Sequence, residues 1–167
     1  MTSVVDHAHG PDSPAIRPAL LTRGTMVTAD LGRARHFYED FLGLECVRYA
    51  ADGLMVRDRD PEKRRQGRGG VYWTIDVRQV AAIGNRQNLF KHWGIDVDSD
   101  QAVDQAHDRA KALKAELGLG KVMKPRLQHG SYSFYLEDFD GNWWEIEHRP
   151  DGDDNDAVFA RGDVVTG

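Results

Sequence analysis

The stretch Ser131-Tyr-Ser-Phe-Tyr-Leu-Glu-Asp-Phe-Asp-Gly-Asn-Trp-Trp-Glu-Ile-Glu-His148 decides the fold. Apolar and polar side chains alternate in both halves of this stretch, which is typical of two half-buried strands. Between them, Phe139-Asp140-Gly141 fits a three-residue loop in which Gly141 adopts the left-handed conformation that closes a hairpin. The stretch therefore predicts an antiparallel hairpin.

The length of this loop also fixes which residues face each other. Leu136 is expected opposite Trp144 on one face, and Tyr135 opposite Glu145 on the other. The first face is apolar and predicts core. The second face carries a phenol beside a carboxylate, which is compatible with a reactive site or with an ordinary solvated face.

Composition limits the classes of function. The chain has 167 residues, 40% hydrophobic and 29% charged, with a net charge of -5. The stretch 57–68 is rich in basic residues but also contains acids and a proline, so we expect a solvated loop and no nucleic-acid binding. The single cysteine, Cys46, is expected to be a packed residue in a reducing compartment. No apolar run is long enough to span a membrane, and a cytoplasmic protein is expected.

Three regions are expected along the chain. Residues 1–18 are predicted to form a flexible leader, residues 19–149 the folded domain, and residues 150–167 an acidic disordered tail. Within the domain, one order of elements occurs twice, which divides it into module one (19–80) and module two (90–149).

Each module is predicted to contain one strand, one helix and three strands. Asp30 is expected to cap the first helix and Gly43 to end it, while Ser99 or Asp100 caps the second and Gly118 ends it. Strands are expected at 23–29, 44–49, 54–57, 71–77, 91–97 and 121–125, and in the hairpin quoted above. This is an α+β fold of two βαβββ modules that form a curved mixed sheet, with one face covered by helices and the other open as a cup.

Polar residues of the alternating strands are expected to line the cup. They are Arg23, Thr25, Thr74, His92, Asp96, Tyr135 and Glu145. Trp143 shares the side of Glu145, where it is expected to stack on an aromatic ligand or to lie at a rim or interface. Trp73, Trp93 and Trp144 fall on the apolar side and are expected in the core.

The order of elements and two motifs resemble the vicinal oxygen chelate superfamily, which includes glyoxalases, bleomycin-resistance proteins, fosfomycin-resistance transferases and extradiol dioxygenases. The motifs are Asp30-Leu-Gly-Arg-Ala-Arg-His-Phe-Tyr-Glu-Asp-Phe-Leu-Gly-Leu44 and Phe134-Tyr-Leu-Glu-Asp-Phe-Asp-Gly-Asn-Trp-Trp-Glu-Ile146. The resemblance covers about residues 20–149. It implies a small-molecule ligand and a homodimer, but it does not define the reaction, because one fold hosts many chemistries.

The resemblance also implies where a metal would bind. Metal-dependent members take ligands from the start of the first strand, the start of the fifth and the end of the eighth, which match Arg23, His92 and Glu145. His92 and Glu145 suit Fe(II), Mn(II), Ni(II) or Zn(II). A guanidinium offers no lone pair, so Arg23 breaks the usual His-His-Glu set at its first member.

Three interpretations remain open. In the first, His92 and Glu145 hold a metal with His129 or Glu147 as third ligand, and the resemblance to extradiol dioxygenases gives Tyr135 and His129 catalytic roles. However, His129 is closer to Tyr135 in sequence than their signature requires, and Phe139 occupies the usual proline.

In the second interpretation no metal binds. Arg23 then pairs with Glu145 or with an anionic ligand, and the protein performs acid–base chemistry or sequesters a small molecule. In the third, the Arg23–Glu145 pair is purely structural. We favour an enzyme in which Tyr135 and His129 are catalytic, His92 and Glu145 bind a divalent metal, and the substrate contacts Arg23, Thr25, Thr74, Asp96 and Trp143. The alternative is a metal-free binding protein.

Overall fold

The computed structural model describes residues 23–59, 74–84 and 86–150. The predicted leader and all but the first residue of the predicted tail lie outside these ranges, and so does Trp73.

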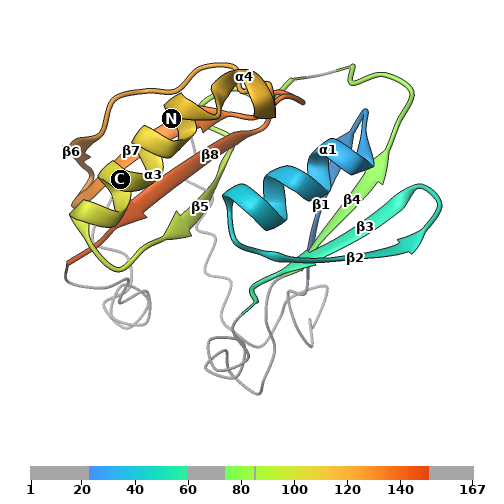
Figure 1. Ribbon diagram of the computed structural model, residues 1–167, viewed down its shortest axis with the longest axis horizontal. Coiled ribbons are helices and arrows are strands. Elements are labelled where there is room, and N and C mark those ends of the chain that lie inside the picture. Colours follow the sequence, from blue (N-terminus) through green and yellow to red (C-terminus); the bar gives the residue numbers. More distant parts are fainter. Residues whose placement is uncertain (1–22, 60–73, 85, 151–167) are drawn as a thin grey trace, which may run out of the picture.

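The described residues form two modules with the same order of elements (Figure 1). Module one contains β1 (Arg23–Thr28), α1 (Leu31–His36), η1 (Phe37–Phe41), β2 (Glu45–Ala50), β3 (Gly53–Arg57) and β4 (Thr74–Gln79). Module two contains β5 (His92–Asp96), α3 (Asp100–Ala112), α4 (Lys114–Leu117), β6 (Arg126–Gln128), β7 (Ser131–Glu137) and β8 (Trp143–His148). The predicted α+β fold of two βαβββ modules is confirmed.

Each module folds into a four-stranded mixed sheet. The strand orders are β1-β4-β3-β2 and β5-β8-β7-β6. In both sheets the first strand pairs in parallel with the last, and the remaining pairs are antiparallel. The parallel pair is made possible by the helix that follows each first strand, because a parallel connection must cross over the sheet.

Local sequence signals explain where the helices begin and end. The Asp30 carboxylate accepts hydrogen bonds from the N–H groups of Gly32 (2.8 Å) and Arg33 (3.1 Å), and the Ser99 hydroxyl accepts one from Ala102 (3.1 Å). These side chains satisfy donors that have no partner in the first helical turn. Gly118 ends α4 with a φ of +66°, the left-handed conformation expected of a terminating glycine.

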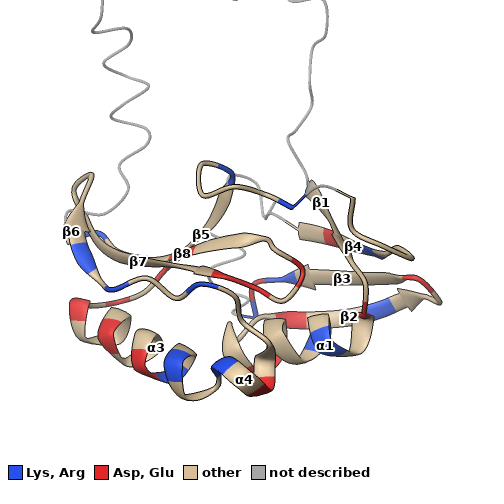
Figure 2. Cartoon of the chain, turned by 90° about the horizontal axis from the view of Figure 1, so that it is seen from above, with Lys and Arg blue, Asp and Glu red and all other residues tan. Residues whose placement is uncertain are grey.

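The helices of both modules cover the same side of the two sheets, and none of the helices in the described ranges lies on the opposite face (Figure 2). Trp144 of β8 is fully buried on the helix side, where its ring lies 5.8 Å from that of Phe37 and 5.7 Å from that of Tyr38. The core therefore joins the modules beneath the sheets, and the outer face is left for polar residues.

The edge strands β1 and β5 approach each other at Gly24. A Cβ atom at this position would overlap the indole ring of Trp93. Glycine is required here because the Trp93 ring occupies the space that any larger side chain would need. This contact brings the start of β1 beside the start of β5.

The hairpin adopts the predicted register. Tyr135 pairs with Glu145 and Leu136 with Trp144, and Gly141 has a φ of +85°. The buried Asp138 carboxylate stabilises the loop by accepting hydrogen bonds from the main-chain N–H groups of Asp140 and Asn142 and from the Trp144 indole.

Two boundaries differ from the prediction. The strand expected at 121–125 is reduced to an isolated bridge between Val122 and Leu136, and β6 begins after Pro125. Proline has no N–H to donate, so the hydrogen-bonded ladder is interrupted there. The second helix, expected to be continuous, is divided into α3 and α4 at Leu113.

Cys46 is buried, as expected, and burial raises the pKa of its thiol to about 12. Among the described helices, none has the length and the apolar character needed to cross a membrane.

Candidate functional site

Three neighbouring strands of module two bring His92, Tyr135 and Glu145 together on the open face. Tyr135 and Glu145 are direct partners in the β7–β8 ladder. His92 pairs with Trp143, two residues before Glu145, because β5 runs parallel to β8. Alternation along each strand gives these residues the same side of the sheet, opposite to the buried Trp144 and Ile146.

His92 and Glu145 are in direct contact. The Nε2 atom of His92 lies 3.1 Å from Oε2 of Glu145, and Nδ1 lies 2.6 Å from the main-chain oxygen of Leu89. A carbonyl oxygen only accepts hydrogen bonds, so Nδ1 carries the proton of that bond. Nε2 then faces the carboxylate with a lone pair or with a second proton. A lone pair would be repelled, so a proton or a metal cation must lie between the two atoms.

Tyr135 completes this group. Its ring centroid lies 5.0 Å from that of His92, with the planes at 70°. Burial, followed by the adjacent Glu145 carboxylate, raises the pKa of Tyr135 to about 12. Tyr135 is therefore a neutral hydrogen-bond donor at physiological pH.

A chain of hydrogen bonds reaches Glu145 from the surface. The Ser133 hydroxyl donates to Oε1 of Glu145 (2.7 Å), the Gln128 amide donates to Ser133 (2.8 Å), and Arg126 donates to Gln128 (2.6 Å). Every donor in this chain points toward the carboxylate. This chain of hydrogen bonds fixes the orientation of the Glu145 carboxylate, as outer hydrogen bonds do for the ligands of a metal site.

Sequence analysis did not assign a role to Ser133, Gln128 or Arg126. The alternation of the hairpin did place Ser133 on the face of Tyr135, which was the available signal. Gln128 and Arg126 lie in β6, the strand that was expected a few residues earlier in the chain.

The predicted substrate-binding residues are distributed over both sheets. Arg23 starts β1, which the Gly24–Trp93 contact holds beside β5, and it pairs with Thr74 of β4. Thr25 is exposed in β1 and Asp96 is exposed at the end of β5. Trp143 is buried, with only 7% of its surface exposed.

His129 is not brought to this group. With Gly130 it forms the exposed two-residue turn between β6 and β7, where both residues have positive φ (51° and 83°). Six residues of extended chain, about 20 Å, separate it from Tyr135. Glu147, the other candidate third ligand, forms an ion pair with Arg149 at 3.0 Å.

The other histidines lie elsewhere. His148 is on the helix side of the sheet, with Nδ1 2.8 Å from the Asp100 carboxylate. His107 is mostly covered, and its ring packs against that of Phe134 with centroids 5.3 Å apart.

The residues present fit part of a metal site. Two ligands bound at about 2.1 Å and at right angles lie about 3.0 Å apart, which matches the 3.1 Å between His92 Nε2 and Glu145 Oε2. The fixed Nδ1–H of His92 is the usual arrangement for a histidine that binds metal through Nε2. Within residues 23–59, 74–84 and 86–150, however, no group of three His, Cys, Asp or Glu side chains could hold a metal ion.

Module one carries a different group at the corresponding register. Asp76 of β4 occupies the position that Glu145 occupies in β8, and Arg23 of β1 corresponds to His92 of β5. The buried Asp76 carboxylate accepts a 2.6 Å hydrogen bond from the Tyr49 hydroxyl and a 3.2 Å bond from Arg78.

Solved structures share this fold. A possible glyoxalase from Bacillus cereus is 24% identical with a TM-score of 0.57, and the match covers 78% of this chain and 99% of that one. The fosfomycin resistance protein FosX from Listeria monocytogenes is 20% identical with a TM-score of 0.56 (79% and 92% covered). Lactoylglutathione lyase from Agrobacterium tumefaciens is 22% identical with a TM-score of 0.53 (79% and 95% covered).

At these identities the likeness shows the fold alone. No curated protein matches the chain. A family model, described as the glyoxalase/bleomycin resistance protein/dioxygenase superfamily, matches residues 20–146 and therefore spans both modules. The chain belongs to the glyoxalase/bleomycin resistance protein/dioxygenase superfamily.

Proposed function

We propose that this chain is an enzyme acting on a small molecule with adjacent oxygen atoms, and that His92, Tyr135 and Glu145 form its reactive group. One observation carries the proposal. Leu89 holds the Nδ1 proton of His92, so the contact of Nε2 with Glu145 requires a proton or a cation between them. A site that binds a proton or a metal cation at this position is suited to proton transfer or to metal-assisted catalysis.

Among the cations, a divalent metal such as Mn(II), Fe(II), Ni(II) or Zn(II) suits this pair of ligands. A variant of FosX from Listeria monocytogenes, 19% identical to this chain, has been solved as a complex with Mn(II) and a dihydroxypropylphosphonic acid. When bound, the metal would bind adjacent oxygens of the substrate and stabilise negative charge on them. The remaining ligands of the metal would have to be water or substrate, because the Arg23 guanidinium has no lone pair with which to bind it.

The residues of the chain would share the remaining work. Ser133 holds Glu145 in one orientation, so its second oxygen stays directed toward His92. Tyr135, neutral at physiological pH, would donate a hydrogen bond to the oxygen on which charge develops. Arg23 would attract an anionic substrate, and Thr25, Thr74, Asp96 and Trp143 would contact it around the open face. His129 is too far along the hairpin to take the proton-transfer role within this site.

A second candidate is a metal-free binding protein. It is favoured by Arg23, which occupies the strand position where metal-dependent members carry their first ligand. In this case the imidazolium of His92 would pair with Glu145, and the two cations would bind an anionic compound for sequestration.

Metal titration separates the two candidates. Protein stripped with a chelator is titrated with Mn(II), Fe(II) or Zn(II) by calorimetry, and we expect one site per chain that weakens by about 100-fold or more in His92→Ala. His148→Ala is the matched control, since His148 lies on the opposite face, and it should leave the affinity unchanged. Failure of the parent chain to bind any of these metals would overturn the metal enzyme in favour of the metal-free candidate.

Two assays then test the reaction class. Protein reconstituted with Fe(II) is supplied with catechols while oxygen uptake is followed, and protein reconstituted with Zn(II) or Ni(II) is supplied with hemithioacetals. Turnover that is lost in Tyr135→Phe at unchanged metal affinity supports the role given to Tyr135.

We also propose that the chain acts as a homodimer. The edge strands β2 and β6 carry exposed apolar residues, Val47 and Leu127, which a second copy would cover. Light scattering coupled to size exclusion tests this, and a monomer at micromolar concentration would contradict it.

A further inference from the structure

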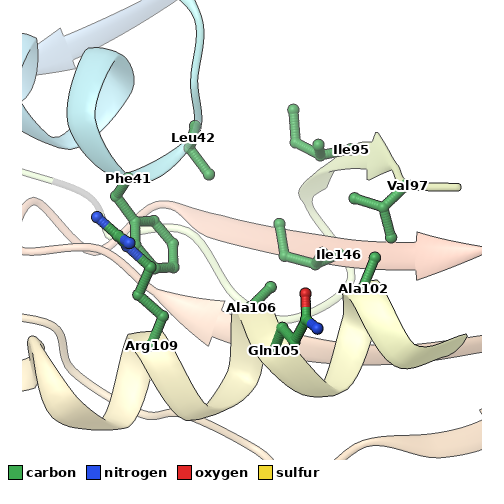
Figure 3. Close-up of a pocket in the computed structure, with 9 residues that line it drawn as sticks. All are labelled: Phe41, Leu42, Ile95, Val97, Ala102, Gln105, Ala106, Arg109 and Ile146. Carbon is green, nitrogen blue, oxygen red and sulfur yellow. The ribbon is translucent and has the colours of Figure 1, made fainter. Parts of the chain in front are cut away.

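A pocket lies on the helix side of module two, away from the open face. It has a volume of about 510 Å³ and is bordered by η1, β5, β8 and α3 (Figure 3). All but two of its nine lining residues are apolar. None of them belongs to the reactive group described above.

Small residues of α3 create this space. Ala102 and Ala106 are one turn apart, so they lie on the same face of the helix, next to the stripe of Val103 and Ala110 that is buried in the core. Opposite them, Ile95 of β5 and Val97, which follows this strand, are only half-buried. A helix carrying larger residues at 102 and 106 would fill the gap, so the alanines leave an apolar wall uncovered.

Module one supplies the second wall through an unusual turn. The N–H of Leu42 bonds to the oxygen of Phe37 five residues earlier (3.1 Å), and Phe41 stacks on Phe37 with ring centroids 5.5 Å apart. Turns of this π-helical type are rare in proteins, and those that occur are often found at functional sites. This turn directs Phe41 and Leu42 into the pocket between the modules.

The two polar lining residues stand together on α3. Gln105 and Arg109 are one turn apart and both are exposed. Figure 3 shows Arg109 beside Phe41 at one end of the pocket, with Ile95 and Val97 at the other end. Of the carboxylates in the described residues, none forms an ion pair with Arg109, whereas Arg35 of α1 is paired with Glu39. The pocket therefore has a cation at one end and an apolar interior.

We propose that this pocket binds a medium-chain aliphatic carboxylate. Arg109 and Gln105 would bind the carboxylate group, since a guanidinium and an amide both donate hydrogen bonds to its oxygens. The hydrocarbon chain would lie against Phe41, Ile95 and Ala106. This inference does not depend on the reactive group of module two, because it concerns the other side of the sheet.

Calorimetric titration of the full chain with decanoate tests the chemistry of the ligand. Decanol provides the same chain without the charge, and decyltrimethylammonium reverses the charge. We expect decanoate to bind about tenfold or more tightly than decanol, and the ammonium compound to bind least. In a series from hexanoate to decanoate, each added methylene should tighten binding by up to about fourfold.

Variants locate the site. Arg109→Gln should weaken decanoate binding by about tenfold and leave decanol unchanged, and Ala106→Trp should abolish both because the indole fills the pocket. Ala102→Phe provides a second filling variant if Ala106→Trp does not fold. Lys111→Gln removes a cation of α3 that does not line this pocket, and it should have no effect.

Three results would overturn the inference. They are the absence of decanoate binding below its aggregation concentration, equal affinities for decanoate and decanol, and decanoate binding that survives a folded filling variant. Circular dichroism melting identifies the variants that fold. The metal titrations of His92→Ala give a separate result, so failure here leaves the proposed function intact.

Discussion

The two modules each place a buried carboxylate at the same register position, but the two carboxylates have different partners. Asp76 and Glu145 are almost equally buried, with 5% and 7% of their surfaces exposed. Asp76 is held by Tyr49 and by Arg78, a permanent cation. Glu145 instead faces the Nε2 atom of the His92 imidazole.

The two carboxylates therefore differ in their partners and hardly at all in their burial. A guanidinium stays charged at every accessible pH and leaves no position for a substrate or metal, whereas an imidazole with one nitrogen fixed leaves the other available. Because the fold is duplicated, Asp76 of module one can be compared directly with Glu145 of module two.

The largest expected effect tests whether the two modules contribute unequally to the shared core. Trp144 of module two is fully buried between the modules, while its counterpart in module one, Ile75, is only partly buried. Trp144→Ala should lower the free energy of unfolding by about 3–5 kcal/mol, and Ile75→Ala by about 1–2 kcal/mol. Urea denaturation measures both. Equal losses of unfolding free energy would mean that the two modules contribute alike to the core.

The next effect makes module one resemble module two. Arg23 is the counterpart of His92, so Arg23→His adds an imidazole at the position where metal-dependent relatives carry one. We expect metal affinity to rise by at least about tenfold, or about 1.4 kcal/mol, measured by calorimetry with Mn(II) and Zn(II). Arg23→Gln is the control, because it removes the cation without adding a ligand. An affinity unchanged by Arg23→His would show that the start of β1 does not face the metal.

A smaller effect tests whether the carboxylate of module one is structural. Asp76→Ala and Tyr49→Phe each remove one partner of a hydrogen bond and should each cost about 1 kcal/mol of stability. The ion pair with Arg78 adds little, because that side chain is 42% exposed. The double variant should cost less than the sum of the two, since both changes remove one contact. Metal affinity should not change in any of these variants, and a loss would assign Asp76 to the site.

A further effect is confined to alkaline pH. The pKa of Tyr135 is raised to about 12, mainly by burial, above the ordinary value of 10. Its contribution to stability is complete below pH 10 and is lost as the pH rises through 12, because only the folded state resists ionisation. Tyr135→Phe should therefore flatten the loss of stability between pH 10 and 12 and remove one phenol from the ultraviolet titration. A parallel curve in parent and variant would contradict this.

Local alternation predicted much of this fold. The hairpin register followed from period-two patterning and from Gly141, because a loop of fixed length allows one alignment of its strands. The proximity of His92 and Glu145 instead followed from the family resemblance and the duplicated order of elements, because no local pattern links β5 to β8.

Other parts of the site could not be predicted. β6 has three residues and only a weak pattern, so the approach of Gln128 to Ser133 had no local signal. The Leu89 carbonyl that fixes His92 belongs to a loop, where main-chain direction depends on tertiary packing. The pocket beside α3 was hidden because Ala106 matches a core pattern whether or not the space opposite it is filled.

The absence of a side chain at Gly24 has a consequence for the width of the cup. Because the indole of Trp93 lies against bare backbone, the two sheets approach each other closely at this point. Even a methyl group at residue 24 would overlap the indole ring, so the two strands would have to move apart. The lone hydrogen atom of this residue therefore limits the spacing between the starts of β1 and β5.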